Sequence, residues 1–147
     1  MLSTIPTPLS PHDTLAESLQ ALVRRGVQRH FEPGAILIRE GDHGDSLYVL
    51  LSGRLRVHGA GAQAGSEVTF GFCEAGDYVG EMGLDGGLRS ASVTAVLPST
   101  CAVVNRQALL DHLRDDPAFA LAMMGKVIRR IRATSGALRR IKPALTD

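Results

Sequence analysis

The sequence predicts a mainly β domain with flanking helices. Between Val27 and Asn105, short β-prone runs alternate with turns that contain Gly and Asp, and many short strands at such spacing are typical of an antiparallel sandwich or barrel. Helical periodicity takes over on both sides of this region. We expect a loose lead-in over residues 1–13, one domain over 14–142 and a tail over 143–147, with the β region at about 27–105 and the C-terminal helices at about 106–142.

Composition argues against several classes of protein. The 147 residues carry a formal net charge of +1, so bulk charge does not favour nucleic acid or a membrane surface. No apolar run approaches the roughly 20 residues of a membrane span, and the N-terminus lacks the basic and apolar regions of a signal peptide. Two cysteines, Cys73 and Cys101, do not amount to a disulfide framework. We therefore expect a soluble cytoplasmic protein with free thiols.

The first expected element is a helix over Thr14–Arg25. Thr14 can cap this helix, and Glu17 stands three residues later, as in a capping box. Gly26 then provides a stop signal at its C-terminal end.

The β region contains seven expected strands, VQRHF, AILIRE, SLYVLLS, RLRVHG, EVTFGFC, ASVTAV and TCAVVN. In the third, Leu47, Val49 and Leu51 alternate on one predicted face. Leu55 and Val57 are expected to continue the same sheet after the next turn. This part of the chain therefore predicts a strand, a polar turn and a hairpin.

The C-terminal region returns to helical periodicity. RQALLDHLRDD predicts one short helix, Pro117 can begin the next, and a long helix is expected over Ala118–Ile141. Apolar residues recur along it at alternating spacings of four and three, as in a coiled-coil seam: Ala120, Met124, Val127, Ile131, Thr134, Leu138 and Ile141. This seam either packs inside one monomer or pairs two chains into a homodimer, and the sequence leaves both open.

The stretch GEMGLDGGLRSASV, Gly80 to Val93, has the composition of an anion cradle. Glycines let backbone N–H groups approach an anion closely, and a short helical turn is expected to start at Gly80. Arg89 is the only Lys or Arg between Arg56 and Arg106, and its planar guanidinium suits two phosphate oxygens. Glu81 can accept a hydrogen bond from a hydroxyl, so a sugar phosphate or nucleotide fits. The alternative is that Glu81 and Arg89 pair with each other and pin a surface loop.

The longer stretch YVGEMGLDGGLRSASVTA resembles the phosphate-binding cassette of cyclic nucleotide-binding domains. This family includes the sensor domain of the bacterial catabolite activator protein and the regulatory subunits of the cAMP-dependent kinase. FEPGAILIREGDHGDSLYVLLSGRLRV resembles the family's opening strands, and VVNRQALLDHL resembles its exit into the first C-terminal helix. The resemblance covers roughly Val27 to Ile141. It implies a β-roll of jelly-roll type with one N-terminal helix and two C-terminal helices.

The resemblance also implies roles for residues of the cassette. Backbone contacts to the ligand are implied for Gly80, Met82 and Gly83. Glu81 is expected to accept the ribose 2′-hydroxyl, and Arg89 is expected to bind the cyclic phosphate. The resemblance also implies that Ser90 and the backbone of Ala91 support the phosphate and that Val79 packs on ligand carbons.

The resemblance extends to base recognition. RRIRATSGAL is similar to the long helix in which a Thr-Ser pair reaches the adenine amine, with the serine supplied by the partner subunit, and Thr134 and Ser135 occupy the matching places. Arg132 is a candidate to lie over the base as a cation–π partner. Ser90 keeps guanine open, because a hydroxyl after the arginine can also help to bind it in this family. We therefore expect cAMP, with cGMP as the alternative.

Other features of the sequence favour ordinary roles. Residues 126–142 hold seven basic residues and no acidic one, for which a solvated helix face is expected ahead of a nucleic-acid patch, and no DNA-binding domain is expected in this chain. The histidines His30, His43 and His58 are too widely spaced to suggest a metal site. No nucleophile–base pair stands out, so neither a catalytic nor a metal site is expected.

These observations leave two hypotheses. The first is a non-enzymatic cyclic-nucleotide sensor in which the ligand moves the C-terminal helix and acts on an unknown effector protein in trans. The second is a non-binding module that keeps the fold and dimerises through its C-terminal helix. The second is favoured by the spacing of eight from Glu81 to Arg89, where relatives have nine or ten, and by Leu88, where many have proline.

Overall fold

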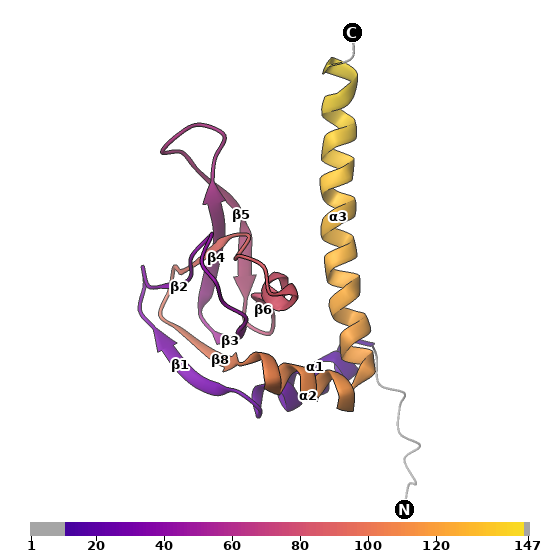
Figure 1. Ribbon diagram of the computed structural model, residues 1–147. Coiled ribbons are helices and arrows are strands. Elements are labelled where there is room, and N and C mark those ends of the chain that lie inside the picture. Colours follow the sequence, from indigo (N-terminus) through magenta and orange to yellow (C-terminus); the bar gives the residue numbers. More distant parts are fainter. Residues whose placement is uncertain (1–10, 146–147) are drawn as a thin grey trace, which may run out of the picture. The chain divides into compact units, whose positions relative to one another are not determined.

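The computed structural model describes the backbone of residues 11–145 and the side chains of residues 17–133. The chain divides into two compact units, residues 1–112 and 113–147, and each is described by itself. The elements are α1 (Pro11–Val23), β1 (Val27–Phe31), β2 (Ile36–Ile38), β3 (Leu47–Ser52), β4 (Arg54–Ala60), β5 (Glu67–Glu74), β6 (Tyr78–Val79), the short 3₁₀ helix η1 (Glu81–Asp85), β7 (Ser92–Ala95), β8 (Ser99–Val104), α2 (Arg106–Asp115) and α3 (Pro117–Leu145) (Figure 1).

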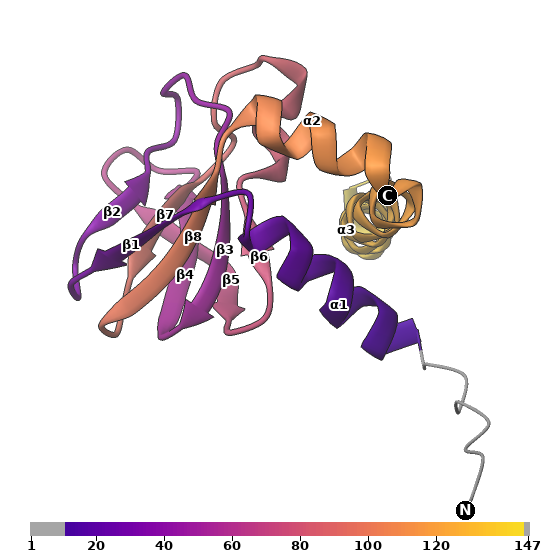
Figure 2. The ribbon, with the colours of Figure 1, turned by 90° about the horizontal axis from the view of Figure 1, so that it is seen from below.

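The strands form two four-stranded antiparallel sheets, which confirms the predicted mainly β class. One sheet has the order β1-β8-β3-β6 and the other β2-β7-β4-β5. In the view from below, the strands of the first unit lie together to the left of α1 (Figure 2). Apart from the β4–β5 hairpin, neighbouring strands are not consecutive in sequence, since β3 lies between β8 and β6 and β7 lies between β2 and β4. This arrangement is the jelly-roll β-roll that the sequence resemblance implied.

The predicted hairpin between the third and fourth strands is wrong. β3 pairs with β8 and β6, whereas β4 pairs with β5 and β7, so the chain changes sheet between Ser52 and Arg54. Gly53 makes this corner with a φ of 101°, in the region that favours glycine. A β-carbon on Gly53 would lie 2.6 Å from the carbonyl oxygen of Pro98, so the corner is also too tight for a side chain.

The prediction that Leu51 shares the buried face of β3 is also wrong. The β3–β8 register shifts between Leu50 and Ser52, which places two residues where strict alternation expects one. Leu50 is therefore fully buried, while Leu51 keeps 38% of its surface exposed.

An apolar cluster fills the interior between the sheets. Its buried members are Ile38, Leu50, Leu55, Cys73, Val79, Val93, Ala95 and Cys101. They come from strands of both sheets, so the cluster joins the two layers. Burial raises the pKa of the Cys101 thiol to about 11, which keeps this thiol protonated and unreactive at neutral pH.

The helices extend beyond some of their expected ends. α1 begins at Pro11, a favoured first helical residue, rather than with a cap at Thr14, and it ends at Val23. In the first unit, Ser18 Oγ lies 3.3 Å from His112 Nε2, so α1 and α2 meet through a buried polar contact. In the second unit, α3 reaches Leu145, past the expected boundary at residue 142. Within residues 11–145, no helix combines the length and the apolarity that a membrane span requires.

Candidate phosphate-binding site

The glycine-rich cassette is the connection from one sheet to the other. β6 belongs to the β1-β8-β3-β6 sheet and β7 to the other, and residues 80–91 join them. Gly80 leaves β6 with a φ of 102°, and η1 follows at once. Gly86 ends η1 with a φ of 80°, and its N–H donates to the carbonyl of Gly83. The predicted helical turn after Gly80 is therefore present, and two left-handed glycines define its length.

Arg89 is held inside this cassette by backbone carbonyls. Only 7% of its surface is exposed. Its Nη1 donates to the carbonyl of Gly80 at 3.0 Å, and its Nη2 donates to the carbonyl of Ser46 at 2.9 Å. Its own backbone bonds to the β2–β3 loop in both directions, because Arg89 N donates to Asp42 O at 2.8 Å and Gly41 N donates to Arg89 O at 2.9 Å. Both the guanidinium and the backbone of Arg89 are thus fixed.

The charge of Arg89 has no carboxylate partner in the part of the chain whose side chains are described. Its side-chain hydrogen bonds go to carbonyl oxygens, which carry only partial charges. A guanidinium has five N–H donors, and a buried cation is costly unless an opposite charge compensates it. The site therefore has the electrostatic character of an anion-binding site.

Three glycines allow the cassette and the β2–β3 loop to close on Arg89. A β-carbon on Gly83 would lie 2.8 Å from Arg89 Nη1, and one on Gly44 would lie 3.0 Å from Arg89 Nε. A β-carbon on Gly80 would lie 3.2 Å from Nη1 and 2.7 Å from the carbonyl oxygen of Ser46. Any side chain at these positions would push the guanidinium or the loop away.

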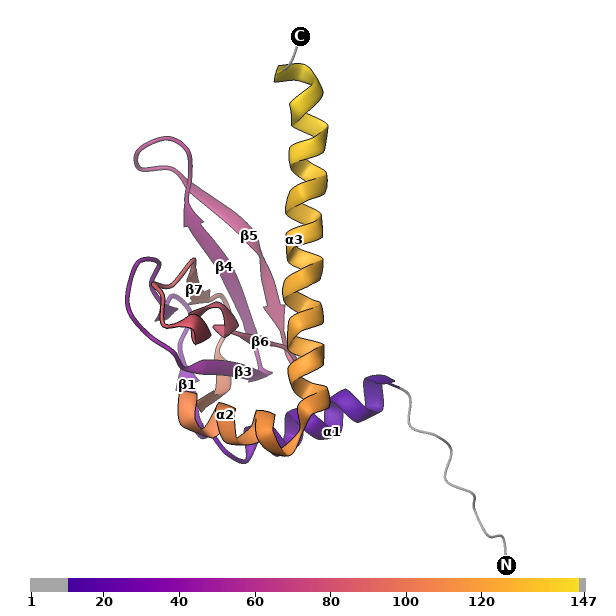
Figure 3. The ribbon, with the colours of Figure 1, turned by 45° about the vertical axis from the view of Figure 1, so that its right-hand side comes forward.

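The β2–β3 loop is the part of the site that sequence reasoning missed. GDHGD was expected to be only a polar turn, yet it brings Gly44 and Ser46 to Arg89. Its His43 also forms an antiparallel bridge with Leu88 of the cassette. Figure 3 shows the coil of η1 beside this loop. The two Gly-Asp pairs are the sequence feature that could have indicated a role for this loop. They do not, however, reveal a contact with a segment more than forty residues away.

Glu81 is buried at the start of η1, with 6% of its surface exposed. The alternative that Glu81 pairs with Arg89 to pin a surface loop is not observed, because both side chains are buried and the guanidinium bonds to Gly80 and Ser46 instead. Glu81 directly follows Gly80, whose carbonyl accepts a hydrogen bond from Arg89.

The other predicted residues of the cassette differ in their exposure. Val79 is 9% exposed and belongs to the apolar cluster, so it joins the cassette to the core. Met82 is 41% exposed, Ser90 is exposed and Ala91 is half-buried. The structure therefore brings Gly80, Gly83 and Arg89 into contact and leaves the side chains of Met82 and Ser90 open to solvent.

The residues predicted to contact the base lie on α3, in the second unit. Arg132 is exposed there. Thr134, Ser135 and the seam residue Leu138 lie outside the residues whose side chains are described. Of the other seam residues, Met124 is 59% exposed and Ile131 is 58% exposed, whereas Val127 is partly buried.

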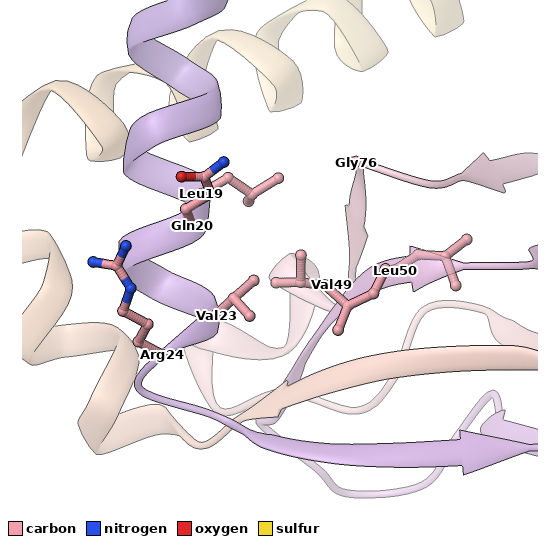
Figure 4. Close-up of a pocket in the computed structure, with 8 residues that line it drawn as sticks. Leu19, Gln20, Val23, Arg24, Val49, Leu50 and Gly76 are labelled. Carbon is pink, nitrogen blue, oxygen red and sulfur yellow. The ribbon is translucent and has the colours of Figure 1, made fainter.

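A separate hollow of about 480 Å³ lies between α1 and β3 (Figure 4). Leu19 and Val23 of the helix point toward Val49 and Leu50 of the strand, while Arg24 points away. Its lining shares no residue with the cassette. Among the described residues, no group of His, Cys, Asp and Glu side chains is placed to hold a metal ion.

Comparison with known proteins identifies the family. The sequence model described as "Cyclic nucleotide-binding domain" matches residues 28–116. The Cyclic AMP receptor protein of Thermus thermophilus is 30% identical over 122 residues, which are 82% of this chain and 56% of the relative. A cGMP-dependent protein kinase of Toxoplasma gondii is 38% identical over 88 residues, which are 59% of this chain and 8% of the kinase.

Solved structures give the same result. The crystal structure of Thermus thermophilus Catabolite Activator Protein matches with a TM-score of 0.80 at 28% identity, covering 92% of this chain and 61% of that one. The N-terminal domain of a transcriptional regulator from Streptomyces coelicolor matches with a TM-score of 0.63 at 28% identity, covering 89% and 88%. The chain spans little more than half the length of the curated cAMP-activated regulators that it matches.

Proposed function

The chain belongs to the family of cyclic nucleotide-binding domains, and from this premise we propose that it is a regulatory module that binds cAMP. The observation that carries the proposal is Arg89, a buried cation held by two backbone carbonyls, with no acidic partner among the described side chains. A cyclic phosphodiester carries one negative charge and two free oxygens. It therefore supplies the missing charge in a shape that a guanidinium fork can hold.

The rest of the cassette suits the sugar beside that phosphate. Glu81 would repel the phosphate, so we assign it to the ribose 2′-hydroxyl, which can donate to a carboxylate. The backbones of Gly80, Met82 and Gly83 contact the ligand, and Ser90 with the backbone of Ala91 supports the phosphate. The place of Glu81 supports this assignment, because it directly follows Gly80, whose carbonyl accepts a hydrogen bond from Arg89, and the ribose adjoins the cyclic phosphate.

The choice of adenine rests on the second unit. We assign the base to Thr134, to Ser135 of a partner subunit and to Arg132 lying over the ring. The names of the relatives include both cAMP-activated regulators and cGMP-dependent kinases, so cGMP is the competing ligand. Ser90, exposed directly after Arg89, is the residue through which guanine would be favoured.

The output of the module is a change in its C-terminal helix. The exposed seam residues Met124 and Ile131 support pairing of two copies through α3. We propose a cytoplasmic homodimer without enzymatic activity, in which the ligand favours one arrangement of α3 and that arrangement is read by a partner protein.

Calorimetry tests the proposal. The parent is titrated with cAMP, cGMP and AMP, the last as a nucleotide without the cyclic phosphate, and cAMP is expected to bind most tightly. A dissociation constant of about 100 µM corresponds to a binding free energy of about −5.5 kcal/mol. If neither cyclic nucleotide binds more tightly than this, the sensor function is contradicted.

Variants of Arg89 test the phosphate contact. Arg89→Ala is expected to abolish measurable binding, and Arg89→Lys to weaken it, because lysine keeps the charge but loses the fork. Arg106→Ala, which changes an exposed arginine at the start of α2, is the matched control and should bind as the parent does. An Arg89→Ala variant that binds like the parent would show that the phosphate lies elsewhere.

One observation favours the second function, a non-binding module that dimerises through α3. The guanidinium of Arg89 already has two carbonyl partners, and the cassette is short. Light scattering combined with the calorimetric titration separates the two, since the second module would be a dimer that binds neither cyclic nucleotide.

A further inference from the structure

Glu40, which lies just after β2, forms one hydrogen bond through its backbone and another through its side chain. Its backbone N–H donates to Ser92 Oγ at 2.8 Å, and its carboxylate Oε2 accepts the N–H of Ala60 at 2.9 Å. Ser92 begins β7, immediately after the cassette, and Ala60 ends β4. One residue therefore joins the exit of the cassette to the far end of the β4–β5 hairpin.

The carboxylate of Glu40 occupies a hydrogen-bonding position beside Ala60 that no neighbouring strand fills. The pairing of β4 with β7 stops at His58 and Ser92, so Ala60 lies two residues beyond the last pair. On its other side, Ala60 is paired with Glu67 of β5. A strand N–H without a ladder partner needs another acceptor, and a carboxylate forms a stronger hydrogen bond than a neutral group does.

Gly59 gives the carboxylate room to reach Ala60. A β-carbon on Gly59 would lie 3.1 Å from Glu40 Oε2 and 2.9 Å from the ring of Phe70. Glu40 is exposed, and the absence of a side chain at Gly59 leaves the space that its carboxylate occupies beside Ala60.

The same segment is bound to the arginine of the cassette. Gly41 and Asp42, the next two residues after Glu40, hold the backbone of Arg89 through hydrogen bonds of 2.9 and 2.8 Å. A continuous series of hydrogen bonds thus runs from Arg89 through the Glu40–Asp42 segment to Ala60.

We propose that Glu40 is a positioning residue that ties the β4–β5 hairpin to the backbone of Arg89, so that binding of an anion at Arg89 is transmitted to the hairpin. The transmission rests on the proposed function, whereas the tie itself is a property of the ligand-free chain. Contiguous contacts alone do not prove coupling, so the experiment measures the tie and the transmission separately.

Amide hydrogen exchange, resolved by residue with NMR, measures both properties. The full chain is compared with Glu40→Ala, with Glu40→Gln, which keeps an oxygen acceptor, and with Glu32→Ala, which removes an exposed carboxylate in the β1–β2 turn. Without ligand, the amides of Ala60 and Gly61 are expected to exchange at least about tenfold faster in Glu40→Ala than in the parent. Glu40→Gln should fall between them, and Glu32→Ala should match the parent.

The second measurement adds saturating cAMP. The ligand should slow exchange at Ala60 and Gly61 in the parent and in Glu32→Ala, but not in Glu40→Ala, although exchange at Arg89 slows in all three. A merely structural role for Glu40 would change the ligand-free rates and leave this ligand-induced protection intact.

Two results would overturn the proposal: unchanged ligand-free exchange at Ala60 in Glu40→Ala, or equal protection of the hairpin by cAMP with and without the carboxylate. If Glu40→Ala does not fold, Glu40→Gln decides by the same two criteria. A parent that binds no cAMP would contradict the transmission and the proposed function, whereas the ligand-free comparison would still decide the tie.

Discussion

Gly83 is a position at which the cassette is expected to tolerate a side chain poorly. A β-carbon there would lie 2.6 Å from the carbonyl oxygen of Gly44 and 2.8 Å from Arg89 Nη1. The first contact is with backbone, so Gly83→Ala cannot be accommodated without moving the β2–β3 loop. The second contact is with a guanidinium held by the carbonyls of Gly80 and Ser46, so relief there breaks a hydrogen bond.

The magnitude follows from these two contacts. Overpacking of this kind costs about 1–3 kcal/mol, and the roughly 0.5–1 kcal/mol by which alanine is preferred to glycine in a helix offsets only part of it. For a chain of this size we expect Gly83→Ala to melt roughly 2–10 °C below the parent. Because the displaced group is Arg89, cAMP binding should weaken at least about tenfold.

Thermal melting followed by circular dichroism and calorimetric titration with cAMP measure the two effects. Gly71→Ala in β5 is the matched control, because a β-carbon there meets nothing within 4 Å. The control should melt close to the parent and bind cAMP as the parent does. A Gly83→Ala variant with the melting temperature and affinity of the parent would refute the close packing of the cassette against the loop.

Three further predictions follow from the same structure. Ser46→Ala should bind cAMP as the parent does, because Arg89 uses the carbonyl of residue 46 and not its hydroxyl; a large loss in calorimetry would contradict this contact. Leu50→Ala should lower the free energy of unfolding by about 2–5 kcal/mol and Leu51→Ala by less than about 1 kcal/mol, because only Leu50 is fully buried; urea denaturation would show equal losses if the bulge in β3 were absent. Burial raises the pKa of Cys101 from 9.0 to about 11, so its contribution to stability is present below pH 9 and is lost as the pH rises toward 11. Cys101→Ala should therefore flatten the fall in stability over that range in urea melts, and an unchanged slope would contradict the raised pKa.

Local pattern was sufficient for most of the β region. β1 has the predicted bounds, and the cores of the other expected strands were predicted to within a few residues. Strand β6 was missed because its two residues are too few to show alternation. The hairpin at Gly53 was predicted wrongly, since a short turn between two apolar runs looks the same whether the chain stays in one sheet or crosses to the other.

The same distinction applies to the candidate site, where the sequence predicted some of the residues and not others. Gly80, Glu81 and Arg89 lie within ten residues, so their types and spacing already predicted an anion cradle. Ser46 completes the cradle through its backbone carbonyl, and any residue has a carbonyl, so residue type gave no indication of its role. Gly44 contributes by its lack of a side chain, but its residue type does not reveal that it lies beside Arg89.

The sequence by itself determined the mainly β class, the helical turn after Gly80 and the isolated cation at Arg89, because each depends on neighbouring residues. Only the tertiary structure decided that β3 and β4 lie in different sheets, that the β2–β3 loop holds the guanidinium and that Glu40 reaches Ala60. These contacts join segments about 20 to 45 residues apart, and the packing of the whole jelly roll brings such segments together.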